Sequence, residues 1–390
     1  MLVLLSTLAL AAQPSAAGDG AGTVDLDFVG TFAIPGMPHV PIGVEPIING
    51  TPYDKVDWPE TGAMVVKLGL RYGTQVFEFI TPICSSTLIA PDVVLLAAHC
   101  VDEKTLQYSL PGNAEIIEFA FDRKADLSSY QNGNPYNLGV VVASGTKKHP
   151  KFDINNFNSF SSLGVSKNDD IALLFLEEPV LEVDHAYLPT AEEVEQILEG
   201  NVVEIVGWGQ RDAANPYTAG IKYGGVSDIG ELGAHELQIG ADASDVRKCH
   251  GDSGGPTFMA FETDSAVEHR VIGVTSHAYD LTDCASKGGV DTRVDAYLDW
   301  IEDEMVAACD EGLRTWCDWP GIVPPPDADG YHAWEVNPND PVDPFGGVGD
   351  DEDEASSSSS EGSGGCSTVS GSVGLAGGLV GLVGLLGRRR

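Results

Sequence analysis

The sequence predicts an all-β domain that ends in one helix. Between residues 47 and 302, short apolar and β-branched runs such as IALLFL and RVIGVTSH are separated by clusters of Gly, Asn, Asp and Pro. This spacing is typical of many short antiparallel strands. Residues 294–308 then place Tyr297, Ile301 and Met305 on one helical face, so a helix should close the domain.

The charge balance excludes one large class of partners. The 390 residues contain 21 Lys and Arg against 59 Asp and Glu, which gives a net charge of −38. Because binding to phosphate needs a basic patch, we expect no nucleic-acid partner. A strongly acidic surface instead suits a soluble protein outside the cell.

The segment before the domain has the layout of an export signal. Residues 1–17 combine an apolar core with small residues at Ser15 and Ala17, which is typical of a signal peptide; a buried N-terminal strand is the alternative. Residues 18–46 are rich in Gly and Pro and lack periodicity, as expected of a pro-segment or linker. Export implies an oxidising compartment, so the seven cysteines are interpreted first as disulfides, with one left over.

The composition changes after Cys317. Residues 318–365 contain PPP, DDEDE and SSSSS and cannot bury enough apolar surface to fold, so we expect a disordered stalk. The DADG sequence within it suggests calcium, but the alternating ligands and the final Glu of an EF-hand loop are missing. The nine histidines also lack metal-ligand spacing such as H-E-x-x-H. We therefore expect neither a metal nor a cofactor.

Three stretches supply the groups that nucleophilic catalysis by a serine requires. A serine hydroxyl needs a base to take its proton, and a third group must orient that base. LLAAHC offers His99 after an apolar strand, NDDIALLFL offers Asp170 at the start of another, and GDSGGP offers Ser253 between glycines. Taken singly, each also fits a structural role, as a core histidine, a strand-capping aspartate or a glycine-rich turn.

Together, and in this order, the three stretches resemble the chymotrypsin/trypsin-like serine peptidases. ICSSTLIAPDVVLLAAHC, GWG at 207–209 and VTS at 274–276 extend the resemblance, which covers roughly residues 47–302. It implies two six-stranded antiparallel Greek-key barrels with the active site between them and a C-terminal helix. The peptidase domain should then span 47–317, act on protein or peptide substrates and work without a cofactor.

The resemblance assigns a role to each residue of the catalytic set. His99 would act as the general base and then as the general acid, and Ser253 would attack the carbonyl carbon of the substrate. Asp170 would fix the tautomer of His99 and stabilise its imidazolium. Asp169 is the less favoured neighbour because DIAL sets the register. Activity should rise with pH as the imidazole loses its proton.

The resemblance also implies an oxyanion hole and an activation step. The backbone N–H groups of Gly251 and Ser253 would form the hole, typically worth about 3 kcal/mol of barrier per donor. The IING sequence resembles the new N-terminus that this family makes by cleavage, and the freed amine of Ile47 would pair with Asp252. Alternatively, Asp252 only caps its turn. Because Pro46 rather than Arg or Lys precedes Ile47, a different peptidase would have to make the cut.

Two cations precede the serine at the position where the family has the floor of its primary specificity pocket. Arg247 falls on the floor, where trypsin-like members carry an aspartate, and Lys248 follows it. An unpaired buried cation is costly, so one of the two should pair with Asp291 on the opposite wall. The other could then receive an acidic substrate side chain. If one cation instead turned to solvent, a small or mixed preference would follow; preference for Lys or Arg is the least favoured outcome.

Three further residues of the expected pocket lie on its wall. Ser276 should support the buried Asp170. His277 stands where the family usually has a tryptophan, which makes the groove more polar. Ala278 stands where a glycine is usual, which narrows the entrance.

Six of the seven cysteines are expected to pair, and each disulfide would add roughly 3 kcal/mol to the free energy of unfolding. Two pairs are implied by the resemblance and the third by proximity in the chain. The expected pairs are Cys84 with Cys100, Cys249 with Cys284, and Cys309 with Cys317.

Residues 366–390 combine Cys366, a Gly-rich apolar run and three terminal arginines. This arrangement resembles the MYXO-CTERM sorting tail of myxobacterial surface proteins, and Cys366 would be a processing or lipidation site. The arginines match the positive-inside tendency. The apolar run is short for a stable span, which typically needs about 20 residues, so a transient membrane anchor that is later processed is expected. A plain anchor or a flexible tail are the alternatives.

The main hypothesis is therefore a secreted or surface-anchored serine endopeptidase that is made as a zymogen. A protease fold that has lost catalysis and binds ligands at the cell surface is the alternative. Such modules usually lack a triad residue or the glycine of the oxyanion hole, and here all are present. A purely structural surface protein is favoured only by the stalk and the tail.

Overall fold

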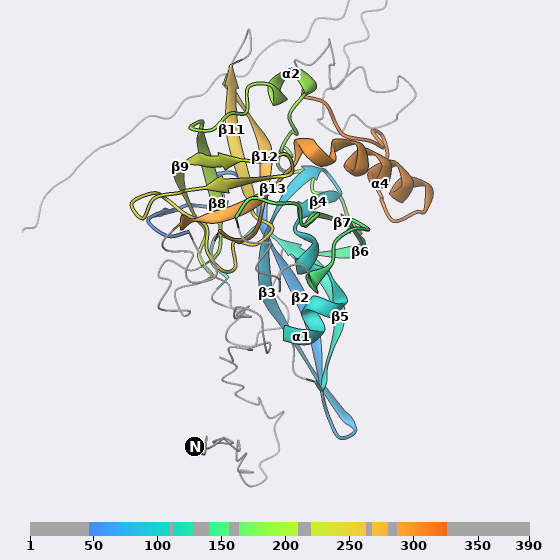
Figure 1. Cartoon of the computed structure of the whole chain (residues 1–390). Coiled ribbons are helices and arrows are strands. Elements are labelled where there is room, and N and C mark those ends of the chain that lie inside the picture. Colours follow the sequence, from blue (N-terminus) through green and yellow to red (C-terminus); the bar gives the residue numbers. More distant parts are fainter. Residues whose placement is uncertain are drawn as a thin grey trace, which may run out of the picture. The chain divides into compact units, whose positions relative to one another are not determined.

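Two closed β-barrels make up most of the described chain (Figure 1). The computed structural model describes residues 47–109, 112–127, 140–155, 164–209, 220–262, 267–279 and 287–325. The first barrel closes in the order β2-β3-β4-β7-β6-β5. Its strands are β2 (Thr61–Tyr72), β3 (Gln75–Ala90), β4 (Val93–Leu96), β5 (Ala114–Asp122), β6 (Val140–Lys148) and β7 (Ala172–Leu176).

The second barrel repeats this connectivity. Its strands follow the order β9-β10-β13-β12-β11-β8, and β8 pairs with β9 to close the ring. A short β1 (Thr51–Pro52) pairs with the edge of β9. The strands are β8 (Val202–Gly207), β9 (Tyr223–Leu232), β10 (Glu236–Ile239), β11 (Pro256–Glu262), β12 (Val267–Ala278) and β13 (Gly289–Arg293). All pairings are antiparallel, so the predicted architecture of two six-stranded barrels is confirmed.

The described helices are short. They are η1 (Ala98–Cys100), α1 (Glu103–Ser109), α2 (Ala191–Val194), η6 (Asp295–Tyr297) and α4 (Leu298–Asp310). The predicted closing helix is present as η6 and α4, and Ile301 and Met305 on its expected inner face are buried in the larger core cluster. Among the described helices, none is long and apolar enough to cross a membrane.

The packed domain extends beyond the boundary expected at Cys317. Val323 is only 2% exposed and belongs to the same core cluster as α4. The predicted disulfide between Cys309 and Cys317 is present and ties the start of this extension to the helix. Part of the segment 318–325, which the sequence assigns to the stalk, thus packs against the domain. The remaining stalk, the sorting tail with Cys366, the signal peptide and the pro-segment lie outside the described residues.

An ion pair anchors the C-terminal extension to the first barrel. The Arg314 guanidinium donates from Nε and Nη2 to Oδ1 of Asp92, in the turn between β3 and β4, at 3.0 and 2.8 Å. The backbone N–H groups of Thr315 and Trp316 donate to Oδ2 at 2.9 and 2.8 Å. Both charged side chains are 0% exposed. Four N–H donors thus satisfy the two oxygens of the Asp92 carboxylate.

Candidate active site

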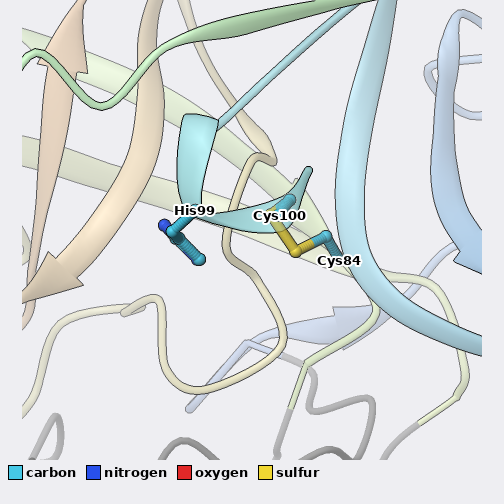
Figure 2. A group of neighbouring side chains, drawn as sticks. All are labelled: Cys84, His99 and Cys100. Atoms are coloured by element: carbon cyan, nitrogen blue, oxygen red, sulfur yellow. A yellow bond between two sulfur atoms is a disulfide. The ribbon is translucent and has the colours of Figure 1, made fainter. Parts of the chain in front are cut away.

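His99 follows directly from a buried strand of the first barrel. β4 is buried along its whole length, and η1 turns the chain immediately after it. A disulfide joins Cys100 to Cys84 on β3, as predicted, and fixes the turn that carries His99 (Figure 2). These three residues are close enough to resemble a metal site, but the two sulfur atoms are bonded to each other and are not thiolate ligands.

The two carboxylate oxygens of Asp170 hold His99 at two points, the imidazole ring and the backbone N–H. Its Oδ2 lies 2.8 Å from Nδ1 of His99, and its Oδ1 accepts the backbone N–H of His99 at 2.9 Å. Asp170 is 0% exposed. Burial alone raises the pKa of this carboxyl group, but His99 and the hydrogen bonds from His99 and Ser276 outweigh burial and hold it below its ordinary value. Asp170 therefore remains ionised throughout the neutral range.

The second barrel supports Asp170 from the other side. Ser276, near the end of β12, donates its hydroxyl to Oδ2 of Asp170 at 2.6 Å. Thr292 on β13 donates to the backbone carbonyl of Asp170 at 2.9 Å. The neighbouring Asp169 accepts instead from the Tyr297 hydroxyl at 3.0 Å. Asp170 rather than Asp169 is therefore the partner of the histidine.

The turn that carries Ser253 lies against β3 and the residues that follow β4. The carbonyl of Ser253 accepts from the backbone N–H of Ser85 at 2.9 Å. Gly254 has φ +79°, and a Cβ at this position would lie 2.5 Å from the Ser85 carbonyl oxygen and 3.2 Å from the Ala97 nitrogen. Only glycine permits this close approach. The two barrels thus bring the serine turn to the histidine turn.

The backbone N–H groups of Gly251 and Ser253 meet no acceptor among the described residues. Gly251 has φ +87°, which favours glycine, and its carbonyl accepts from the Ser85 hydroxyl at 3.1 Å. That same hydroxyl oxygen accepts the backbone N–H of Trp208 at 3.1 Å. Ser85 is therefore a positioning residue for the serine turn. It was not identified from the sequence, because its only signal was its place within the ICSS stretch.

Asp252 is buried without a cation that forms a salt bridge to it among the described residues. Its oxygens accept backbone N–H groups from Gly209 at 2.8 Å and Cys249 at 3.0 Å. Burial raises its pKa well above the ordinary value, and the nearby Lys248 opposes this only in part. Ile47 is 1% exposed, and Ile48 exchanges backbone hydrogen bonds of 2.8 and 3.0 Å with Arg247.

Lys248 is the cation that pairs with Asp291. Its Nζ lies 2.7 Å from Oδ2 of Asp291 and donates to the Thr257 hydroxyl, also at 2.7 Å; both charged side chains are 0% exposed. Burial lowers the pKa of Lys248, against the attraction of Asp291. Arg247 is 3% exposed. The alternative in which one of the two cations turns out to solvent is therefore wrong.

The predicted wall residues lie where β12 meets β13. His277 and Ala278 pair with Val290 and Gly289. Nδ1 of His277 lies 3.1 Å from the Ser276 hydroxyl, which links the wall to the support of Asp170. Ala278 packs in a small cluster with Ile48 and Cys249. Cys284 lies outside the described residues, so its pairing with Cys249 remains a prediction.

Comparison with known proteins agrees with this geometry. The family model described as "Trypsin" matches residues 47–301. "Melanization protease 1" of Drosophila melanogaster is 29% identical over 57% of this chain and 58% of its own length, and "Transmembrane protease serine 11G" of Mus musculus is 26% identical over 68% and 57%. The chain thus spans less than two thirds of these two relatives. "Chymotrypsin-like elastase family member 1" of Bos taurus is 27% identical over 67% of this chain and 90% of its own. With the family match covering more than half of its length, the chain belongs to the trypsin family of serine proteases.

Proposed function

We propose that the chain is a serine endopeptidase in which Ser253 attacks the peptide carbonyl, His99 transfers the proton and Asp170 orients and stabilises the imidazolium. The observation that carries this proposal is the buried, ionised Asp170 bonded to Nδ1 of His99. Nε2 of the ring is then the nitrogen that would take the proton from the Ser253 hydroxyl. The N–H groups of Gly251 and Ser253 would bind the oxyanion.

Cleavage of an unstructured peptide library by the chain that begins at Ile47 tests this function. We expect turnover by the wild type and none by Ser253→Ala. A catalytically inactive binding module would give no turnover in either protein.

Activation would begin with the release of Ile47. The freed ammonium would supply the cation that the buried Asp252 carboxylate lacks among the described residues, and the segment that carries Ile47 is already docked beside Arg247. N-terminal sequencing of active material should read Ile-Ile-Asn-Gly, and Asp252→Asn should be processed normally yet remain nearly inactive. Active protein that starts well upstream of Ile47 would refute this step. Pro46 makes self-activation by a trypsin-like specificity unfavourable.

The specificity pocket would favour acidic substrate side chains. Asp291 pairs with Lys248, and Arg247 is the other cation at the position that the resemblance assigns to the pocket floor, where its charge would attract a substrate carboxylate. Arg247→Asp should abolish cleavage after Glu and introduce cleavage after Lys or Arg. Lys67→Asp, on the first barrel, is the matched control and should leave the preference unchanged. Efficient wild-type cleavage after Arg would contradict the assignment.

Residues 1–17 and 366–390 would govern location. The proposed path is export, followed by surface attachment through a tail that is processed at or near Cys366. The support is the sequence pattern of both ends. The intact mass of protein released from the surface tests it: a chain that still ends at Arg390 without modification would exclude processing.

A further inference from the structure

A cavity outside the catalytic centre has the chemistry of a cation-binding site. It has a volume of about 430 Å³, within the range of roughly 300–1,000 Å³ that is usual for small-ligand sites. Its walls come from the segment before β2, the connection between the barrels and the start of β12. The lining includes Trp58, Glu60, Asp184, His185, Tyr187 and His269.

The walls combine aromatic rings with carboxylates. The Trp58 ring stacks on Phe258 at 4.1 Å and meets His269 edge-on at 4.9 Å. His185 and Tyr187 lie 4.8 Å apart, also in ring contact. Asp184 and His269 are exposed and form the mouth, whereas His185 is buried. Aromatic faces beside carboxylates attract organic cations.

The charges at the cavity also favour a positively charged ligand. Burial lowers the pKa of His185 to about 4, so this ring is neutral at physiological pH; burial lowers the pKa of His269 as well. Arg270 is the lining cation, and it is held by Glu193 at 3.1 Å and by Glu268 at 2.9 Å. The arginine is therefore more than neutralised by its own carboxylates. Asp184 adds negative charge at the mouth. Glu60 adds a carboxyl group whose pKa is raised by burial, against the attraction of Lys222.

Trp58 is held in an unusual backbone conformation at the cavity wall. Its φ is +50°, which is costly for a bulky residue. Its carbonyl accepts from the buried ammonium of Lys222 at 2.8 Å and from the Thr61 backbone at 3.0 Å. These hydrogen bonds hold the Trp58 backbone in place. They also bind the Lys222 ammonium to the backbone carbonyls of Asp57 and Trp58.

The proposed ligand is a side chain of another molecule. Residues 18–46 contain no lysine or arginine, and in residues 326–390 the basic side chains are confined to Arg388, Arg389 and Arg390 at the end. The site is also separate from the triad, because Arg270 and Ser276 lie six residues apart on β12, about 20 Å along a strand. From the cavity, its rings and its charge, we propose an exosite that binds a lysine or arginine side chain of a partner protein or substrate.

Binding can be measured on a full-length Ser253→Ala chain, which cannot cleave the probe. The probe is acetyl-Gly-Lys-Gly-amide, titrated by saturation-transfer NMR, with acetyl-Gly-Met-Gly-amide as the neutral match. We expect saturable binding of the lysine peptide, at least tenfold weaker binding of the methionine peptide, and a loss of roughly threefold or more for both Glu60→Gln and Asp184→Asn. Asp299→Asn, an exposed acid on α4, should have no effect.

Either of two results would overturn the proposed exosite. One is that the lysine peptide shows no saturable binding. The other is that the Glu60→Gln and Asp184→Asn variants bind the peptide as tightly as the parent chain. Because Asp184 is exposed, the Asp184→Asn variant should fold normally. The test therefore remains decisive even if Glu60→Gln fails to fold. The measurement needs no catalysis, so its failure is distinguishable from failure of the proposed peptidase activity.

Discussion

Asp170→Asn should lower kcat about 10⁴-fold while leaving KM nearly unchanged, the size of effect typical of this change in serine proteases. The amide cannot stabilise the imidazolium, and its NH₂ group would favour the wrong tautomer of His99. Ser276 and the His99 backbone would still hold the side chain, so the geometry should survive. Steady-state kinetics on a peptide substrate measures both constants.

Asp169→Asn is the matched control. Its carboxylate contacts the Tyr297 hydroxyl rather than His99, so its loss should leave kcat close to the wild type. If the two variants lose activity equally, the assignment of Asp170 as the orienting carboxylate is wrong. A loss confined to KM for Asp170→Asn would also contradict it, since an interaction made in the transition state lowers kcat.

Arg314→Met should destabilise the fold by about 3–5 kcal/mol, because it leaves the Asp92 carboxylate buried without its cation. Urea unfolding followed by tryptophan fluorescence measures the change. The double variant Asp92→Asn with Arg314→Met should recover part of the loss, since the amide oxygen can still accept from the backbone of Thr315 or Trp316.

An exposed ion pair provides the control for this variant. Arg71 and Glu115 pair at 2.9 Å, but their side chains are 56% and 49% exposed. Arg71→Met should therefore cost less than about 1 kcal/mol. Equal unfolding midpoints for the two arginine variants would show that the extension after α4 is not held by Asp92.

The barrels and the candidate catalytic residues could be predicted because their signals are local in the sequence. Strands such as β7 are continuous apolar runs, and the glycines around Ser253 mark a turn that tolerates no side chain at Gly254. The pairing of Asp291 also followed from a simple energetic argument, that a buried cation needs a partner. Only the choice between Arg247 and Lys248 required the structure.

Features that depend on packing between distant segments were missed. Residues 318–325 read as the start of a polar stalk, yet Val323 enters the core because Asp92, more than 200 positions earlier, captures Arg314. Similarly, no residue near Trp58 in the sequence signals its positive φ. The Lys222 ammonium that donates a hydrogen bond to the Trp58 carbonyl comes from the other barrel. Such contacts have no local pattern from which to predict them.

The most direct test of the central claim is covalent labelling of Ser253 with a fluorophosphonate, followed by intact mass and peptide mapping. Protein that begins at Ile47 should gain one adduct, mapped to Ser253. Ser253→Ala should gain none, and His99→Ala should react far more slowly, because the hydroxyl needs its base. Correctly processed wild-type protein that stays unlabelled, while a control protease in the same tube is labelled fully, would contradict the proposed catalytic serine.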